Sequence, residues 1–321
     1  MTFAPGCPGV NASDPALHAE AVAAAARADA TILVLGLDRS IEDEGRDRRS
    51  ITLPAPQLAL AQAVLDAAAA RRAPVVLVLI AGGGVDLSAL QADPRLPAIL
   101  FAGYPGQSGG QAIAEVVFGA VSPSGRLTQT FYPAAFTEQA LEADMRMRPD
   151  PATDYPGRTY RFYAGPEPVY PFGHGLSYAA TRLRAVPCAE ADAEAAEGED
   201  EDGEGRRVLK GRVRLVTVGL DAPDAPVLAR ACVQVASLGP VTGRHVLLGF
   251  LSPPGAGEGG RPLNTLRAFG GVTLAPGDVV VAEMAFTEVD FSLADAEGAW
   301  AVVKGNWTMR MEGVEAVIEV V

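Results

Sequence analysis

The chain has 321 residues, of which 49% are apolar and 20% are charged, so it is long enough to bury two separate cores. Its formal net charge of −13 and isoelectric point near 4.7 argue against a nucleic acid or an anionic membrane as partner, and favour a neutral or small substrate. Charged residues interrupt the long Ala-rich stretches, so no run reaches the ~18 apolar residues that a transmembrane helix needs.

Apolar helices and strands alternate in the first part of the chain. The pattern predicts a helix over 14–29, capped by Ser13 or Asp14, that leads into the apolar strand 30–36. Further helices are expected at 54–70 and 109–118, and further strands at 74–80, 98–101 and 125–132. Strands that are apolar on both faces and alternate with helices predict a mostly parallel sheet covered on both sides.

The rest of the chain divides into three stretches of different composition. Residues 137–178 are rich in Pro, Gly, Arg and Tyr, which predicts a long ordered loop packed across the sheet's edge or the site. Residues 189–206 are acidic and of low complexity, so like-charge repulsion predicts a disordered insertion. Short alternating segments then predict a β-sandwich: 213–218, 229–235, 246–251, 279–286 and 307–311.

Cysteines and glycosylation sequons bear on the cellular compartment. Cys7, Cys188 and Cys232 are too few and too widely spaced for a disulfide framework or a zinc site, so we expect buried or idle thiols. The N-terminus lacks the basic start and apolar run of a signal peptide. Sequons begin at Asn11 and Asn306, and they matter only in a secretory compartment.

A charged stretch follows the first predicted strand. Loops at the carboxyl ends of parallel strands form the ligand crevice of an α/β sheet, so acids at 36–48 lie where substrates bind. Crowded carboxyl groups cost more to ionise together, which can keep one of them protonated as a general acid. A solvated loop neutralised by nearby arginines is the other interpretation, and spacing alone favours it. The carboxyl groups are Glu42, Asp43, Glu44 and Asp47, and the arginines are Arg39, Arg46, Arg48 and Arg49.

Two glycine-containing motifs suggest other chemistry. Gly106–Gly110 matches the G-x-S-x-G elbow of serine hydrolases, with Ser108 as nucleophile and His174 or His245 completing a triad. Pro105-Gly106 separates this serine from the preceding strand, so the alternative is a turn in which Ser108 caps the next helix. Residues 82–84 are three glycines, but no Lys follows them as a phosphate-binding loop requires, so we expect a turn.

Several blocks, in order, resemble glycoside hydrolase family 3, especially the plant and fungal β-xylosidases. The resemblance covers nearly the whole chain. It rests on Gly36–Glu42 with Glu44-Gly45 and Asp47-Arg48, Leu53-Pro54 with Gln57, Pro74–Leu79 with Gly83 and Val85-Asp86, Ala102–Gln107 with Gly109-Gly110, Gly125–Leu127, Met145–Pro149, Tyr155–Tyr163, Val169–Tyr178, Ser252–Gly255 and Leu274–Gly277.

The resemblance implies a fold and a domain order. We expect a family 3 C-terminal α/β sandwich over 1–180, an acidic disordered linker or insertion over 181–206, and a fibronectin type III-like β-sandwich over 207–321. The fold class is thus α/β plus all-β. In this family a TIM-like barrel supplies an Asp nucleophile, and we expect that barrel to be absent before Met1. No metal and no cofactor are implied.

The resemblance also assigns the site residues. The family's Glu before Gly falls on Glu44, which becomes the catalytic acid/base, with Glu42 as second choice; Asp43 stands where the family more often has a small residue. Arg158 and Tyr160 are candidates for binding substrate, against the alternative that they only anchor their loop.

The implied function is that of the C-terminal portion of a retaining exo-β-glycosidase, a β-xylosidase that degrades xylan and hemicellulose. Its partners would be β-xylosides or related oligosaccharides and the barrel domain. The full-length family implies a secreted glycoprotein in the extracellular space or cell wall, and the residues do not choose between xylose, arabinose and glucose. A non-catalytic carbohydrate-binding or scaffold module and a serine hydrolase at Ser108 are the alternatives.

Overall fold

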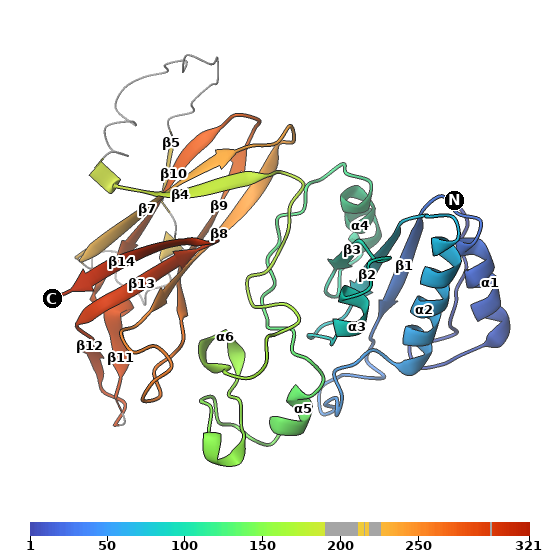
Figure 1. Cartoon of the computed structure of the whole chain (residues 1–321), viewed down its shortest axis with the longest axis horizontal. Helices are drawn as coiled ribbons and strands as arrows, with labels where there is room; N and C mark the ends of the chain where they lie inside the picture. The colour runs from blue at the N-terminus through green and yellow to red at the C-terminus, as the bar shows by residue number, and fades with distance from the viewer. Residues whose placement is uncertain (190–210, 215, 218–225, 296) are drawn as a thin grey trace.

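The computed structural model describes residues 1–189, 211–214, 216–217, 226–295 and 297–321. An α/β part and a β-sandwich lie at opposite ends of the molecule, and a long loop runs between them (Figure 1). No helix in the described ranges has the length and apolar character needed to cross a membrane.

A parallel three-stranded sheet forms the α/β part, in the order β1-β2-β3. Its elements are α1 (Pro15–Ala25), β1 (Thr31–Gly36), α2 (Ala55–Ala69), β2 (Val75–Ile80), α3 (Ser88–Gln91), β3 (Ala98–Phe101) and α4 (Gly109–Val117). Asp14 rather than Ser13 caps α1, because its carboxylate accepts the backbone N–H groups of Ala16 and Leu17.

Burial differs between neighbouring strands of this sheet. Strand β2 is buried along most of its length, as its continuous apolar run predicts. Strand β1 buries Leu33 and Leu35 in the core, whereas Ile32 and Val34 are 41% and 55% exposed. The expectation that helices cover both faces is therefore wrong for β1, since one of its faces is open.

The strand expected at 125–132 does not form. Leu127 N donates to His174 O at 2.8 Å, and Phe131 exchanges backbone hydrogen bonds with Tyr170 in an isolated bridge. The chain bends at Thr128 and Gln129, between these two sets of contacts, so no continuous ladder forms. The segment is therefore paired through Leu127 and Phe131 but is not a strand.

This pairing places His174 in an unfavourable position for a positive charge. Its ring stacks on Tyr170 at 4.9 Å, and burial together with the charge of Arg126 lowers the pKa of His174 below 6.5. The unfolded chain therefore takes up a proton first as the pH falls through 6.5, and stability is lost until the folded pKa is passed.

As the pH is lowered from 7.5 to 5, we expect the urea midpoint of His174→Gln to decrease less steeply than that of the wild type. Parallel pH dependences of the two proteins would contradict this placement of the imidazole.

The loop between the two parts carries α5 (Phe136–Gln139), η1 (Pro151–Thr153) and α6 (Thr159–Phe162). It docks on the sandwich through apolar and polar contacts. Phe172 packs edge-on against Phe250 with ring centroids 6.1 Å apart, and Arg148 Nε donates to Gly260 O at 2.7 Å. Arg126 Nη2 pairs with Glu312 Oε1 at 2.7 Å. These contacts attach the loop and the segment before it to the sandwich.

Two sheets face each other in the β-sandwich, in the orders β4-β7-β10-β5 and β14-β13-β8-β9-β6. Their strands pair antiparallel, except that β10 and β5 pair in parallel. Their members are β4 (Thr181–Val186), β5 (Gly211–Arg214), β6 (Val216–Thr217), β7 (Ala229–Ser237), β8 (Gly243–Ser252), β9 (Thr265–Leu274), β10 (Val279–Phe286), β13 (Gly305–Met311) and β14 (Val314–Val320). Between β10 and β13 lie η2 (Glu288–Phe291) and the hairpin β11 (Ser292–Ala294) and β12 (Trp300–Val302). Val233, Leu247, Met284 and Trp307 belong to one shared core between the sheets.

The sandwich corrects the boundary of the expected linker. Residues 181–186 are not linker but strand β4, which pairs with β7 in the first sheet. The acidic stretch 190–206 lies outside the described residues.

Strand β9 was not predicted from the sequence, and it contains Gly270-Gly271, a pair that resembles a turn. A Cβ on Gly271 would lie 2.6 Å from the Arg244 guanidinium on β8, so the glycine leaves space for this cross-strand side chain.

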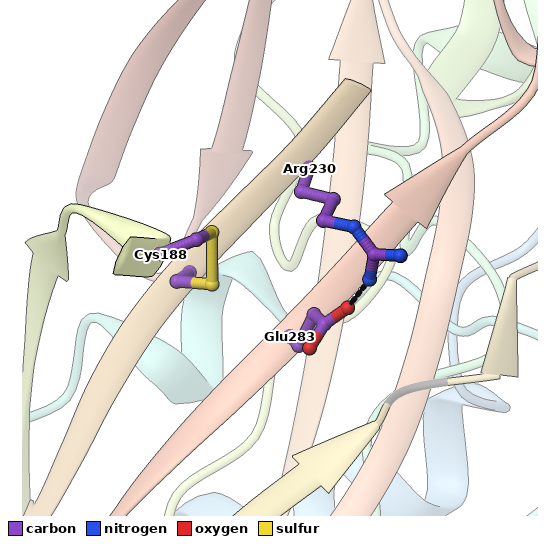
Figure 2. The surroundings of a disulfide bond; sticks show 4 residues. Cys188, Arg230 and Glu283 are labelled. Atoms are coloured by element: carbon purple, nitrogen blue, oxygen red, sulfur yellow. Dashed lines mark hydrogen bonds and ion pairs between the residues drawn. A yellow bond between two sulfur atoms is a disulfide. The ribbon is translucent and has the colours of Figure 1, made fainter. Parts of the chain in front are cut away.

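The expectation that the cysteines are unpaired thiols is wrong for two of them. Cys188 and Cys232 form a disulfide that ties the end of β4 to β7, with their Cα atoms 5.3 Å apart (Figure 2). The register of β7 and β10 places Cys232 opposite the buried Glu283, whose carboxylate pairs with Arg230. Cys7 is a free, half-buried cysteine. Sequence spacing missed the bridge because strand pairing, not sequence proximity, brings its cysteines together.

Candidate active site

The charged loop begins where β1 ends and turns back tightly at its tip. Asp43 O accepts a hydrogen bond from Arg46 N at 2.9 Å, which closes a four-residue turn. Gly45, at the third position of this turn, has φ +71°, a conformation that glycine adopts without strain. Glu44 therefore occupies the exposed tip, and its carboxylate makes no hydrogen bond or ion pair with any described residue.

Glu42 has a different environment in the same loop. Its carboxylate lies 3.2 Å from Nε of Arg48, whose side chain is only 8% exposed. Arg48 Nη2 also donates to Gly84 O at 3.1 Å, so the pair fastens the acidic loop to the turn that follows β2. A Cβ on Gly83 would lie 2.6 Å from Arg48 Nη2 and 3.4 Å from the Glu42 oxygens. The glycine turn thus provides space for this ion pair.

Other polar groups stabilise the loop without contacting the Glu44 carboxylate. Asp43 pairs with Arg39 at 3.0 Å, and Arg46 Nη1 donates to Ser40 O at 3.1 Å. At the start of the loop the buried Gln57 side chain accepts from Gly36 N at 2.8 Å and donates back to Gly36 O at 2.7 Å. The arginines therefore neutralise part of the loop, as the alternative interpretation expected, and among the described residues leave the carboxylates of Glu44 and Asp47 unpaired.

The Glu42–Arg48 pair and its contact with the glycine turn form what we call the brace, and Gly83→Ala tests it. The new methyl group would overlap the Arg48 guanidinium, so we expect a loss of about 1–3 kcal/mol in unfolding free energy, measured by urea unfolding. Gly110→Ala is the matched control, because no atom lies within 4 Å of its Cβ position and it sits in α4, where alanine is favoured. Equal midpoints for Gly83→Ala and wild type would show that the pair does not depend on this space.

A cavity of about 440 Å³ opens beside the brace. Arg48, Gly83 and Gly84 form part of its wall, and Tyr160 lines it as well. The Tyr160 ring stacks on Phe172 at 4.3 Å, and its hydroxyl accepts a hydrogen bond from Leu266 N at 3.2 Å. Tyr160, a candidate for binding substrate, therefore makes structural contacts and also lines the cavity.

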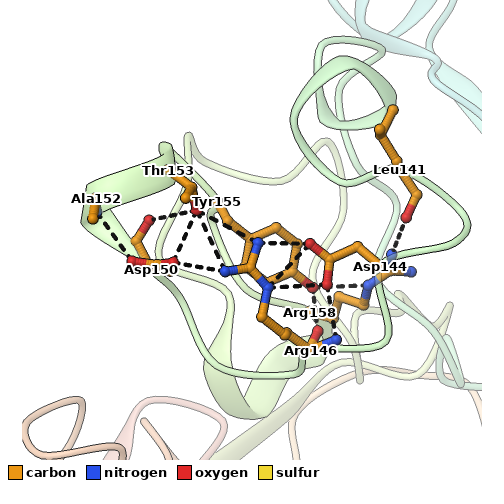
Figure 3. A network of polar contacts seen from close by, with 8 residues as sticks. All are labelled: Leu141, Asp144, Arg146, Asp150, Ala152, Thr153, Tyr155 and Arg158. Atoms are coloured by element: carbon orange, nitrogen blue, oxygen red, sulfur yellow. Dashed lines mark hydrogen bonds and ion pairs between the residues drawn. The ribbon is translucent and has the colours of Figure 1, made fainter.

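Arg158 lies away from this cavity and anchors its loop (Figure 3). Its Nε donates to the Tyr155 hydroxyl at 2.8 Å, and its Nη2 donates to Leu141 O at 2.5 Å. The neighbouring Arg146 pairs with Asp144 at 2.7 Å, and the hydrogen bonds from this arginine lower the pKa of Asp144 to about 2. These contacts favour the anchoring role for Arg158.

The serine-hydrolase alternative lacks its geometry. Ser108 stands at the N-cap position of α4, but its side chain makes no capping hydrogen bond, so the expected capping role is wrong. His245 contacts Thr181 and Glu312, and His174 stacks on Tyr170, so the contacts of these two histidines do not include Ser108.

Among the described residues, no group of three or more His, Cys, Asp or Glu side chains could hold a metal ion.

The sequence patterns did not identify several of the residues that line the cavity. Tyr132 and Phe136 stack at 3.9 Å, and the Tyr132 hydroxyl accepts a hydrogen bond from Thr159 N at 2.8 Å. Tyr132 ends the stretch interpreted as a strand, and Phe136 directly precedes the stretch interpreted as a loop. The clustering of aromatic and threonine residues at 128–137 and 159–160 is the signal that could have found them.

Comparison with known proteins decides the family. The model of the glycosyl hydrolase family 3 C-terminal domain matches residues 10–178, which is more than half of the chain, and a fibronectin type III-like domain model matches 245–313. The chain belongs to glycoside hydrolase family 3. The parallel sheet with helices and the sandwich that follows it agree with the architecture expected from the family.

Family 3 relatives include several curated β-xylosidases. The chain is 46% identical over 197 residues to beta-xylosidase/alpha-L-arabinofuranosidase 2 of Medicago sativa subsp. varia, covering 59% of this chain and 25% of the relative. It is 40% identical over 283 residues to probable beta-D-xylosidase 7 of Arabidopsis thaliana, covering 88% and 35%. The chain thus spans about a quarter to a third of the relatives it matches.

Solved family 3 structures share the fold. A GH3 exo-beta-xylosidase (XlnD) in complex with a xylobiose aziridine activity-based probe superposes with a TM-score of 0.77 at 29% identity, over 97% of this chain and 40% of that chain. A GH3 beta-glucosidase of Bifidobacterium adolescentis gives a TM-score of 0.73 at 25% identity, over 99% and 43%.

Proposed function

We propose that this chain is the C-terminal portion of a retaining exo-β-glycosidase, a β-xylosidase, and that Glu44 is its general acid/base. The observation that carries the proposal is the contrast between the two glutamates. Glu44 is exposed at the tip of a rigid turn with no partner among the described residues, whereas Glu42 is held by the buried Arg48. A proton donor must reach a leaving oxygen, and a carboxylate that already binds an arginine is less suited to this.

The proposed reaction divides the chemistry between two parts of the enzyme. A carboxylate from a barrel domain attacks C1 of the sugar, while Glu44 gives its proton to the leaving oxygen; Glu44 then takes a proton from the water that hydrolyses the glycosyl intermediate. The Glu42–Arg48 pair fixes the loop during both steps. β-Xylosides and related oligosaccharides are the proposed substrates, as the names of the relatives suggest.

We also propose a secreted glycoprotein. The Cys188–Cys232 disulfide supports an oxidising compartment, because cytosolic thiols are normally kept reduced. Asn11 and Asn306, which begin the two sequons, are both exposed and open to modification.

The test compares the chain alone with the chain fused behind a matching family 3 barrel domain. Alone it should leave an aryl xyloside unchanged, because retaining hydrolysis needs a second carboxyl group about 5–5.5 Å from the acid. The fusion should release xylose. Full activity of the chain alone, or no activity of a folded fusion, would contradict the proposed division of labour.

A further inference from the structure

The cavity beside the Glu42–Arg48 pair combines apolar and polar walls. Two stacked aromatic pairs, Tyr132 with Phe136 and Tyr160 with Phe172, contribute to its lining. The lining surface is mostly apolar, and its polar side chains are four threonines and one amide: Thr128, Thr130, Thr137, Thr159 and Gln129. Two of the threonine hydroxyls already have partners, since that of Thr137 donates to Ala134 O and that of Thr159 accepts from Arg161 N. The cavity volume of about 440 Å³ lies within the usual range of small-molecule sites, about 300–1,000 Å³.

Arg48 provides an unused donor in this wall. Its side chain is more than nine-tenths buried, and its Nη1 has no hydrogen-bond partner. Leaving a buried donor unpaired costs about 1–3 kcal/mol, so a ligand atom that accepts from it would be favoured. The charge of Arg48 is already balanced by Glu42 at 3.2 Å, and no other charged residue lines the cavity. The ligand that fits is therefore neutral, with apolar faces and a few hydroxyl groups.

Backbone strain marks the same place. Thr159 has φ +61°, an unfavourable conformation for a β-branched residue, and its N–H donates to the Tyr132 hydroxyl at 2.8 Å. Strain of this kind costs about 1–3 kcal/mol and is often found at ligand sites, where the surrounding contacts maintain it.

We propose that this cavity is a saccharide-binding site that takes one neutral pentose or hexose unit of an oligosaccharide. The apolar faces of the sugar ring pack on the aromatic side chains, and its hydroxyl groups bind the threonines, Gln129 and Arg48 Nη1. Glu44 does not line the cavity, so the unit bound there is not the one whose bond is cleaved. The inference rests on the proposed function only for the choice of xylosyl ligands.

Isothermal titration calorimetry of the whole chain tests this site. Xylotriose should give saturable binding, and glucuronic acid should bind more weakly, because its carboxylate would lose its hydration in a mostly apolar cavity where the charge of Arg48 is already balanced by Glu42. Gln129→Ala removes a lining amide and should weaken xylotriose binding about 3- to 10-fold. Gln139→Ala is the matched control, since its side chain bonds Asp154 at 3.3 Å and does not line the cavity.

Wild-type amide NMR spectra provide a measurement that does not depend on any variant folding. Xylotriose should shift the signals of Gly83, Gly84 and Thr159, which lie in the cavity wall. No saturable binding, binding unaffected by Gln129→Ala in a folded protein, shifts confined to other regions, or a preference for glucuronic acid would each overturn the proposal. Because none of these measurements requires turnover, such a failure would leave the assignment of Glu44 untouched.

Discussion

Glu44→Gln in the fusion with a family 3 barrel is expected to slow xylobiose hydrolysis by about a hundredfold to ten-thousandfold, the usual contribution of a general acid. An amide cannot give up a proton to the sugar alkoxide, which is a poor leaving group. Nitrophenyl xylosides need little protonation when the bond breaks, so their turnover should fall far less. Steady-state kinetics on the two substrates measures this difference directly.

Glu42→Gln is the matched control for this experiment. It should weaken the contact with Arg48 and lower both activities by a similar, smaller factor. Folding should be unaffected in Glu44→Gln, because the carboxylate is exposed and makes no contact with a described residue. If Glu42→Gln abolished hydrolysis of xylobiose while Glu44→Gln left it unchanged, Glu42 would be the acid. If neither mattered, this loop would not carry the acid.

Removing the disulfide should produce the largest change in stability. Cys188 and Cys232 are 44 residues apart, and closing a loop of that length in the unfolded chain accounts for about 4 kcal/mol in the chain-entropy model. Cys188→Ser with Cys232→Ser should therefore lower the urea midpoint strongly under non-reducing conditions.

Cys7→Ser provides the control for the disulfide variant, because Cys7 is the free cysteine and its replacement removes no cross-link. A reducing agent should lower the midpoint of the wild type toward that of the double variant. Equal midpoints for the double variant and the wild type would show that the disulfide does not stabilise the fold.

The elements that sequence patterns predicted well are those determined by local chemistry. Continuous apolar runs predicted β1 and β2, Ser13 or Asp14 was expected to cap α1, and alternating segments predicted β7, β8, β10 and β13. The place of Glu44 in the loop that follows β1 also agrees with the local pattern, because Gly45 provides the positive φ of the turn next to it.

Contacts between distant residues could not be predicted in this way. The brace joins Arg48 to a glycine turn more than thirty residues away, and the disulfide depends on the register of β4 and β7. The expected strand at 125–132 failed for a similar reason, because the chain bends at Thr128 and Gln129 between its contacts with Tyr170 and His174 on the opposite segment. Each of these features depends on what the chain meets after it has folded.

Azide rescue tests the central claim, that Glu44 is the acid/base, most directly. In the fusion, Glu44→Ala should form the glycosyl intermediate from a nitrophenyl xyloside but hydrolyse it slowly, because no base activates water. Azide needs no base, so adding it should restore turnover and yield β-xylosyl azide, identified by NMR. The account predicts this product from Glu44→Ala and not from Glu42→Ala. Formation of β-xylosyl azide by Glu42→Ala alone would contradict it.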